Sequence, residues 1–277
     1  MKNILKIMLM MITIYTITGS AVYAAEIPVS DQDQLITSRD WTEISNLQDE
    51  MKKEEPDATI DYDKALKVYV DCNLIKLQTA DTKKLTSALE SANYVWVIPF
   101  KMEKTYGMFT VAKGLPLSEE AKSVLTKAEQ EEVKNHAGKW MITETAEHTV
   151  EPYYDILLEK REALSDCTRV VLVGSQPGMR QPVALGMDDE TARIWISLGY
   201  QYPVMEKIPE TQNVESGVYS FDSVAEISDT YIEDSEVSTG AGVQSRSSMK
   251  YVAGIGIIVI GSILIPVSYT HLTLPTK

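Results

Sequence analysis

The chain has 277 residues, a length that suits one or two domains, and 44% of its residues are hydrophobic and 24% charged. This composition supports a folded core and excludes a chain that is disordered throughout. The 40 acidic residues outnumber the 26 lysines and arginines, for a net charge of −14. This excess excludes a typical nucleic-acid-binding protein, since phosphate recognition requires a clustered positive surface.

The N-terminus has the order of a secretory signal peptide. Two lysines stand among the first six residues, an apolar run follows to residue 17, and small residues precede a cleavage position after Ala24. We therefore expect a signal peptide over 1–24 and a linker over 25–39. The alternative is an uncleaved membrane anchor, because residues 4–23 are nearly long enough to cross a bilayer.

An extracellular α+β domain is predicted over residues 40–207. Apolar residues at helical spacing, with Ser118 as an N-cap, predict helices over 41–55, 83–92, 118–136 and 153–164. Apolar and β-branched runs between turn signals predict strands over 66–70, 94–100, 108–112, 140–143, 168–173, 183–185 and 192–198. This order predicts a mainly antiparallel sheet with helices packed on one face, and it suggests two β-α-β-β repeats.

A change in composition follows the predicted domain. Residues 208–249 are rich in Ser, Thr, Gly and acidic residues and contain few apolar ones. Such a segment buries too little apolar surface to offset the entropy of its chain, so it predicts a flexible acidic stalk. The alternative interpretation is a docking or calcium-attracting strip, for which the acidic residues show no fixed ligand spacing.

An uncharged apolar run follows the stalk. We expect residues 250–265 to be a truncated transmembrane helix, because a bilayer core requires about 20 apolar residues. Gly254, Gly256 and Gly261 have the spacing of small residues that allow membrane helices to pack closely. Residues 266–277 resemble a translated transposase adapter from short-read sequencing libraries, so we expect the natural protein to continue through the membrane into a short tail.

A cleaved signal peptide followed by a stop-transfer helix places the intervening domain outside the cytoplasm. The expected location is therefore a bacterial cell membrane, crossed once, with the N-terminal domain extracellular. The C-terminal helix would then have the lipid bilayer as its partner, and other envelope proteins or a cell-wall polymer are candidate partners of the domain.

The chain has two cysteines, Cys72 and Cys167, and both fall in the predicted extracellular domain. An oxidising compartment permits a disulfide between them, and the alternative is two free, partly buried thiols. No sequence signature of a cysteine hydrolase surrounds either residue, which argues against a catalytic Cys-His pair.

Catalytic and metal-binding candidates are weak. Ser175 lies in a GSQPG loop that lacks the spacing of phosphate-binding loops and of a nucleophile elbow, so a connecting loop is the simpler interpretation. His136 and His148, with Glu147 and Glu151, match no zinc motif. We therefore predict no cofactor or metal, and we keep Ser175 as the one weak catalytic candidate.

Aromatic residues offer a candidate binding surface. Trp140, Tyr153 and Tyr154 could form an exposed stacking platform for a carbohydrate or cell-wall polymer, whereas core packing is the ordinary use of such side chains. The absence of a catalytic motif favours binding or sensing, or contact with envelope components, over catalysis. The alternatives are a membrane-tethered envelope hydrolase and a structural subunit of a membrane complex.

Overall fold

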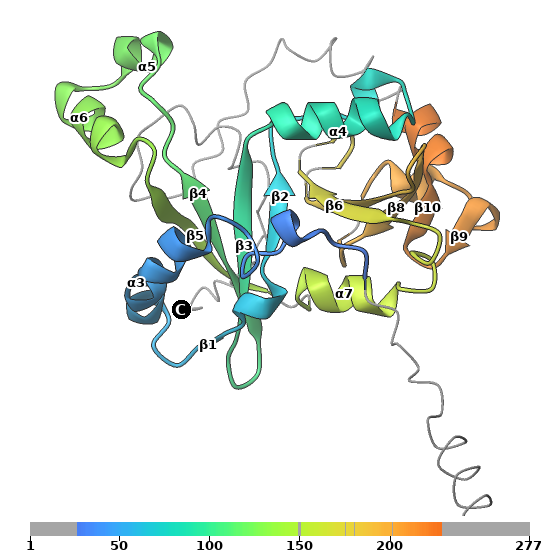
Figure 1. The fold of residues 1–277 in the computed structure, drawn as a ribbon, viewed down its shortest axis with the longest axis horizontal. Coiled ribbons are helices and arrows are strands. Elements are labelled where there is room, and N and C mark those ends of the chain that lie inside the picture. Colours follow the sequence, from blue (N-terminus) through green and yellow to red (C-terminus); the bar gives the residue numbers. More distant parts are fainter. Residues whose placement is uncertain (1–26, 149–150, 175, 180, 201, 229–277) are drawn as a thin grey trace, which may run out of the picture.

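The strands join edge to edge in one mixed sheet (Figure 1). The computed structural model describes residues 27–148, 151–174, 176–179, 181–200 and 202–228. Within these residues the strand order is β5-β4-β3-β2-β6-β7-β8-β10-β9, and β1 pairs with one end of β3. The strands are β1 (Thr59–Ile60), β2 (Leu66–Tyr69), β3 (Tyr94–Lys101), β4 (Tyr106–Lys113), β5 (Trp140–His148), β6 (Arg169–Val173), β7 (Val183–Met187), β8 (Ala192–Ser197), β9 (Asn213–Glu215) and β10 (Val218–Ser220). Among these pairings only that of β2 with β6 is parallel, so the predicted mainly antiparallel α+β fold is confirmed.

Helices and short 3-10 turns connect the strands. They are η1 (Asp31–Asp33), α2 (Trp41–Ile44), η2 (Ser45–Leu47), α3 (Gln48–Glu54), η3 (Tyr62–Lys64), η4 (Ile75–Leu77), α4 (Thr82–Ser91), α5 (Glu119–Val124), α6 (Lys127–His136), α7 (Tyr153–Glu159), η5 (Met205–Lys207) and η6 (Glu210–Gln212). Residues 221–228 are also helical. α4 begins after Asp81, whose carboxylate accepts a hydrogen bond from the Lys84 backbone N–H at 3.1 Å, as expected of an N-cap.

The single helix predicted over 118–136 is wrong, because the segment forms two helices. Ser118 caps α5 as predicted, and its hydroxyl accepts a backbone hydrogen bond. Leu125 is extended, and Thr126 then caps α6 in a capping box with Glu129. A Thr-x-x-Glu sequence in the middle of a helical pattern satisfies the first N–H groups of a new helix, so the chain can break there at little cost.

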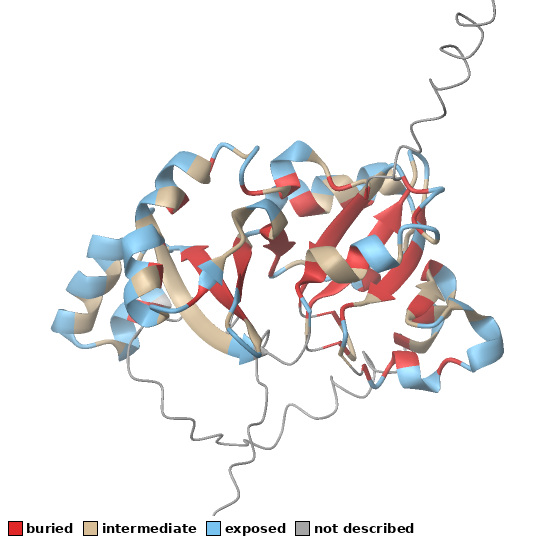
Figure 2. Ribbon diagram, turned by 90° about the horizontal axis from the view of Figure 1, so that it is seen from below, coloured by how far each residue is buried: buried red, intermediate tan, exposed pale blue. Residues whose placement is uncertain are grey.

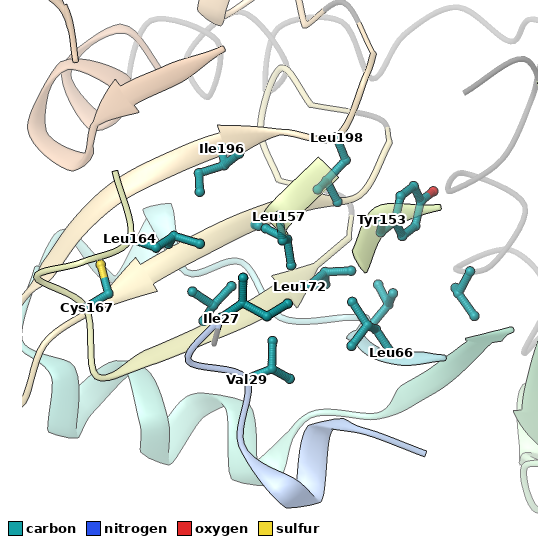
Figure 3. Close-up of a cluster of buried hydrophobic side chains, with 14 of the residues drawn as sticks. Ile27, Val29, Leu66, Tyr153, Leu157, Leu164, Cys167, Leu172, Ile196 and Leu198 are labelled. Atoms are coloured by element: carbon teal, nitrogen blue, oxygen red, sulfur yellow. The ribbon is translucent and has the colours of Figure 1, made fainter. Parts of the chain in front are cut away.

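Helices cover both faces of the sheet, which corrects the prediction of one covered face. On β3, Val95 and Val97 join the apolar cluster beneath α7, whereas Trp96 and Ile98 join the cluster beneath α2 and α3. A third cluster lies beneath α4, and α4 and α7 lie on opposite sides of β6 in Figure 1. Successive residues of a strand point to opposite faces, so the continuous apolar sequence of β3 fits a strand covered on both sides. The buried strands are red in Figure 2, and Figure 3 shows the cluster beneath α7.

The two suggested β-α-β-β repeats pair their strands differently. In the first round, β2 pairs with β3 and β3 pairs with β4. In the second round, β5 pairs with β4 at the edge of the sheet, whereas β6 pairs with β2 and β7. β5 therefore does not lie beside the strand that follows it, and the prediction of two equivalent repeats is wrong.

The folded domain extends past both predicted boundaries. In the predicted linker 25–39, Ile27 and Leu35 are buried, and the Pro28 carbonyl accepts a hydrogen bond from the β6 backbone at 2.7 Å. At the other end, β10 pairs with β8, and Val218 and Val224 are buried. The sparse apolar residues of this acidic segment are the ones that reach the core, so the segment belongs to the fold at least to residue 228.

The predicted signal peptide, the remaining part of the stalk and the predicted membrane helix with Gly254, Gly256 and Gly261 lie outside the described residues. None of the helices that the structure describes is long and apolar enough to cross a membrane.

Candidate functional site

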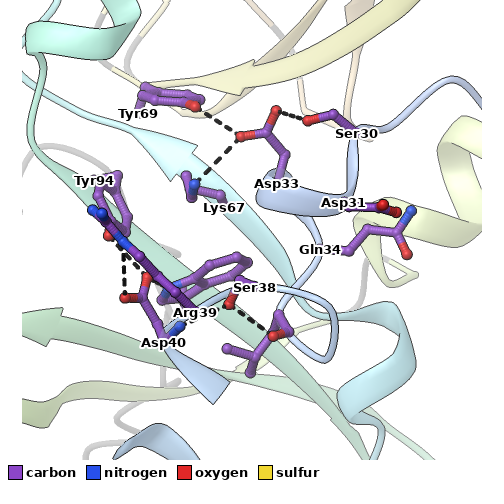
Figure 4. Close-up of polar contacts among 12 residues, drawn as sticks. Ser30, Asp31, Asp33, Gln34, Ser38, Arg39, Asp40, Lys67, Tyr69 and Tyr94 are labelled. Atoms are coloured by element: carbon purple, nitrogen blue, oxygen red, sulfur yellow. Dashed lines mark hydrogen bonds and ion pairs between the residues drawn. The ribbon is translucent and has the colours of Figure 1, made fainter. Parts of the chain in front are cut away.

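Three charged side chains are buried within the described part of the chain: Asp33, Asp40 and Lys67, which are 2%, 7% and 8% exposed. They lie together on the face of the sheet covered by α2, α3 and α4 (Figure 4). Isolated buried charges are strongly unfavourable, so charged groups in such positions are paired. We call these three residues, with Tyr69 and Tyr94, the Lys67 cluster.

Strand register brings the cluster together. Lys67 and Tyr69 are two residues apart on β2 and share one face, while Leu66 and Val68 pack into the core on the other face. Lys67 lies directly opposite Trp96 on β3, and Tyr69 lies opposite Tyr94. Because directly opposed residues on antiparallel strands have adjacent side chains, these two cross-strand pairs surround the lysine with aromatic rings.

The N-terminal segment supplies the two carboxylates. Its backbone follows β6 and then β2, where the Leu35 N–H donates a hydrogen bond to the Ala65 carbonyl at 3.1 Å. This path places Asp33, at the end of η1, and Asp40, immediately before α2, beside Lys67.

Each oxygen of the Asp33 carboxylate has two donors close to it. Its Oδ1 accepts a hydrogen bond from the Tyr69 hydroxyl at 2.7 Å and lies 3.5 Å from the Lys67 ammonium. Its Oδ2 accepts hydrogen bonds from the Ser30 hydroxyl at 2.6 Å and from the Arg169 guanidinium at 2.9 Å. Burial by itself would raise the pKa of Asp33, but the hydrogen bonds from Ser30, Tyr69 and Arg169 together with the Arg169 charge outweigh burial and hold this pKa below its usual value.

Asp40 is held mainly by neutral donors. Its Oδ2 accepts hydrogen bonds from the Tyr94 hydroxyl at 2.8 Å and from the Trp96 indole N–H at 3.1 Å. Its Oδ1 lies 3.9 Å from the Nε of Arg39, whose side chain is 88% exposed. Asp40 therefore contacts both the Tyr94 hydroxyl and an exposed cation.

The Lys67 ammonium is enclosed by aromatic rings. It lies 4.6 Å from the ring centre of Tyr94, 5.2 Å from that of Trp96 and 5.6 Å from that of Tyr69, within the range of cation–π attraction. Among the described residues its one ion-pair partner is Asp33. Burial lowers the pKa of Lys67, and the nearby charges of Asp33 and Asp40 oppose this shift without reversing it.

A cavity of about 430 Å³ opens above this lysine. Lys67, Tyr69 and Tyr94 line it from the sheet, the segment from Thr37 to Asp40 lines one wall, and the end of α4 lines another. We call it the lysine cavity. An ammonium carries three N–H donors, and the Asp33 contact accounts for one of them, so donors remain for an acceptor within the cavity.

A second cavity, of about 340 Å³, shares Tyr94 and Ala92 with the first. Its lining is mainly apolar and includes Val70, Leu115 and Trp140. The ring centres of Tyr94 and Trp140 lie 5.8 Å apart. We call this the tryptophan cavity, and Tyr94 is the common wall of the two.

The backbone at the base of the α5–α6 arm shapes the rim of the tryptophan cavity. The Gly114 N–H donates to the Lys139 carbonyl at 2.9 Å, and the Gly138 N–H donates to the Gly114 carbonyl at 2.8 Å. A Cβ at position 114 would overlap the His136 carbonyl. Glycine is therefore required at position 114 for the two ends of the arm to approach this closely.

The predicted exposed aromatic platform is not present. Trp140 is 7% exposed and Tyr153 is 3% exposed, and they pack in clusters on opposite faces of the sheet. Tyr154 is half-buried against the Tyr153 cluster. The core-packing alternative therefore describes these residues, although Trp140 also lines the tryptophan cavity.

The remaining sequence-predicted candidates are not brought together. Ser175 lies outside the described residues, and Glu151 is an exposed loop residue. His136 ends α6 and His148 ends β5. No group of metal-ligating side chains that could hold an ion occurs among the residues that the structure describes.

Cys72 and Cys167 are free thiols, which corrects the predicted option of a disulfide. Cys72 packs against the cluster beneath α4, whereas Cys167 belongs to the cluster beneath α7 on the other face of the sheet. Burial raises the pKa of the Cys72 thiol to about 12 and that of Cys167 to about 11, so both are protonated and weakly nucleophilic at neutral pH.

We therefore expect both thiols to react much more slowly in the folded protein than after unfolding. A thiol reagent added under non-reducing conditions should modify the native protein slowly and should titrate two thiols per chain in denaturant, because burial blocks reaction in the folded state. Alkylation in denaturant followed by mass measurement provides the check. A count of zero would show that Cys72 and Cys167 are joined, and it would contradict their placement on opposite faces.

Another carboxylate with a shifted pKa, Glu144, lies away from the Lys67 cluster. It lies on β5 opposite Thr110, whose hydroxyl is buried without a hydrogen-bond partner among the described residues. Nearby, the hydroxyls of Tyr153 and Tyr200 lie 3.1 Å apart. Burial raises the pKa of Glu144 to about 7, so this group changes charge near neutral pH.

Glu144→Gln should stabilise the protein at pH 8 but not at pH 5. The carboxyl is neutral in the folded state below pH 7, whereas its ordinary pKa in an unfolded chain is near 4.5, so wild-type stability falls as pH rises between these values. We expect a gain of about 1–2 kcal/mol at pH 8, after allowance for partial exposure. Urea unfolding at both pH values, with the exposed Glu147→Gln as the matched control, measures it. An equal effect of Glu144→Gln at both pH values would contradict the raised pKa.

The Lys67 cluster could not be found from the sequence as long as residues 25–39 are interpreted as a linker. A signal was present, however. Lys67 interrupts the otherwise apolar strand sequence LKVYV, and a charge at an inward position of a central strand requires a buried partner. Asp33 and Asp40 lie in a segment that also contains Leu35, which anchors it in the core.

Comparisons of the chain with protein-family models, with curated proteins and with solved structures each found no match.

Proposed function

We propose that the domain is a ligand-binding or sensing domain without catalysis, displayed on the outer side of a bacterial membrane and anchored by the C-terminal segment. The ligand is a small molecule held in the lysine cavity. The observation that carries this proposal is the Lys67 ammonium, which borders the cavity with N–H donors that its ion pair with Asp33 does not use. Perturbed titratable groups in a cavity are typical of functional sites.

The surroundings of Lys67 support binding because they hold the ammonium in position. Its aliphatic chain extends from the central strand β2, and the rings of Tyr69, Tyr94 and Trp96 surround its ammonium group. Asp33 keeps its hydrogen bonds to Ser30, Tyr69 and Arg169 if the ammonium turns toward a ligand. A donor fixed before the ligand arrives costs less conformational entropy on binding than a flexible one.

The two carboxylates of the cluster favour binding over acid–base chemistry. Asp33 and Asp40 each accept hydrogen bonds that hold them in place beside the cavity. The lowered pKa of Asp33 keeps this group ionised at neutral pH, whereas a general acid needs a pKa near the working pH. The two carboxylates therefore act as fixed acceptors that hold the surrounding side chains in position.

A ligand panel with thermal unfolding as the readout tests the binding proposal. The full chain is screened against sugars, amino acids, carboxylic acids and phosphate esters, beside Lys67→Met and the exposed-lysine control Lys76→Met. A compound at 100 times its Kd contributes about 2.7 kcal/mol, which for a domain of this size raises Tm by about 5–10 °C. Shifts seen in wild type and Lys76→Met but not in Lys67→Met support the proposal. A panel without such a compound contradicts it, and turnover of the bound compound would favour an envelope hydrolase.

The membrane part of the proposal has a separate test. Intact cells that express the full natural gene are treated with an external protease, and the membrane fraction is analysed for the domain. We expect cleavage of the domain from outside and its retention in the membrane fraction before cleavage. Protection from protease in intact cells would contradict extracellular display.

Pull-down of envelope proteins with and without residues 250–265 would separate an ectodomain partner from a structural role of the helix.

A further inference from the structure

We propose that the ligand is a monocarboxylate with an apolar or aromatic body, whose carboxylate lies between Lys67 and Arg39 and whose body extends past Tyr94 into the tryptophan cavity. This inference rests on the proposed function, because it names the ligand class for the same site. It follows from the positions of the two cations, the acidic groups around them and the apolar lining of the second cavity.

Both cations lie close to Tyr94. Lys67 Nζ lies 4.6 Å from the ring centre of Tyr94, and Arg39 Nε lies 3.9 Å from the Asp40 carboxylate, which accepts a hydrogen bond from the Tyr94 hydroxyl. Both residues line the lysine cavity. An ammonium and a guanidinium have donors only, so the group they recognise together is an acceptor, and a carboxylate accepts charge-assisted hydrogen bonds from both.

Asp33 and Asp40 do not occupy all the N–H donors of Lys67 and Arg39. Asp33 already has Arg169 as a partner at 2.9 Å, closer than its contact with Lys67 at 3.5 Å. Asp40 already accepts hydrogen bonds from the Tyr94 hydroxyl and the Trp96 indole, and its contact with Arg39 is 3.9 Å long. The shortest contacts of both carboxylates are thus made with other donors.

Acidic groups at the cavity limit the ligand to a single charge. Asp31, Asp40 and Glu90 line the same cavity as the two cations, and the whole chain has a net charge of −14. A phosphate or a dicarboxylate would place a second negative charge near these groups, where like charges repel. A monocarboxylate meets the two cations without this repulsion.

The tryptophan cavity accounts for the rest of the ligand. Its lining includes Val70, Leu115, Pro116 and Trp140, and Tyr94 separates it from the lysine cavity. Both cavity volumes fall in the range of about 300–1,000 Å³ that is usual for small-molecule sites. An apolar body gains free energy by leaving water for this lining, while the carboxylate stays at the cations.

Titration calorimetry with a matched set of compounds tests the ligand class. The full chain is titrated with 3-phenylpropionate, its primary amide, phenylphosphonate and propionate. We expect the carboxylate to bind about tenfold or more tightly than the amide, since a hydrogen bond to a charged group has this effect on affinity. Phenylphosphonate is expected to be weaker because of its second charge, and propionate because it lacks the ring.

Variants assign each part of the ligand to its cavity. Lys67→Met should abolish the preference for the acid over the amide, and Lys76→Met should preserve it. Arg39→Gln changes an 88% exposed side chain, so it tests the same preference without risk to folding. Leu115→Ser should weaken the acid and the amide equally, whereas Val124→Ser, at an exposed apolar residue of α5 that does not line either cavity, should have no effect.

Two results would overturn this inference and leave the proposed function standing. One is equal affinity for the acid and the amide, or tighter binding of the phosphonate. The other is an equal loss for acid and amide in both Lys67→Met and Arg39→Gln. The proposed function fails separately, when no compound of the broader panel stabilises the protein in a way that depends on Lys67.

Discussion

Replacing Asp33 by Asn is expected to lower the free energy of unfolding by about 3–5 kcal/mol, because it leaves the buried charge of Lys67 and the half-buried charge of Arg169 without their ion-pair partner. Asp33 is 2% exposed and receives four contacts from donors at 2.6–3.5 Å. Urea unfolding at neutral pH measures this loss. Asp31→Asn, two residues earlier on an exposed side chain, is the matched control and should change stability by less than about 0.5 kcal/mol.

The same substitution should remove a component of acid unfolding. The folded-state pKa of Asp33 is held below its usual value of 3.8, so its ionised form stabilises the protein above that value, and the effect is lost as pH falls through the folded pKa. Wild type should therefore lose stability below about pH 4 more steeply than Asp33→Asn. Equal stability of the Asp33 and Asp31 variants at pH 7 would contradict the assignment of Asp33 as the anion that neutralises this part of the core.

The second large effect is expected for Gly107→Ala, which should lower the free energy of unfolding by about 1–3 kcal/mol. Gly107 lies opposite Phe100 in the β3–β4 pair, and the Phe100 ring covers its Cα, so that an added Cβ would overlap the ring. Phe100 is 1% exposed and its ring centre lies 4.6 Å from that of Phe109. The ring therefore cannot turn away without disturbing the core.

A double-mutant cycle distinguishes this overlap from a general cost of alanine at the position. Phe100→Leu creates space over residue 107, so the loss caused by Gly107→Ala should be smaller in the Phe100→Leu background than in wild type. The coupling energy is measured by urea unfolding of the four proteins. Additive losses would show that the Phe100 ring is not the reason for glycine at this position.

The main features of the sheet could be predicted from the sequence because its central strands carry continuous apolar runs. The sequence of β3 is apolar at both Trp96 and Val97, which requires cover on both faces, and the structure has that cover. α4 could be predicted from Leu85 and Leu89 at helical spacing, and both are buried. The order of the strands could not be predicted, because the parallel contact between Val68 and Leu172 joins residues far apart in the chain.

The limits of the domain were harder to predict because its last elements bury few residues. β10 and the helix over 221–228 contribute Val218, Phe221 and Val224 to the core from an acidic segment whose average composition is typical of a linker. The break between α5 and α6 was missed for a different reason. The capping box at Thr126 starts a new helix, whereas the helical spacing of the apolar residues continues through it. Periodicity alone therefore predicts one helix.

The candidate site was predictable only in part. Trp140 was singled out for its aromatic ring, and it lines a cavity, although as a buried residue and without Tyr153. Lys67 was not singled out, because a single lysine in a strand has no motif around it. Its role depends on Asp33, Tyr94 and Trp96, which strand pairing and the N-terminal segment bring to it.

The most direct test of the account is a calorimetric titration of 3-phenylpropionate into wild type, Lys67→Met and Lys76→Met under the same conditions. The account predicts saturable binding at one site in wild type and Lys76→Met, and an affinity lower by about tenfold or more in Lys67→Met. Equal affinity in all three folded proteins would contradict the claim that the Lys67 ammonium binds the ligand.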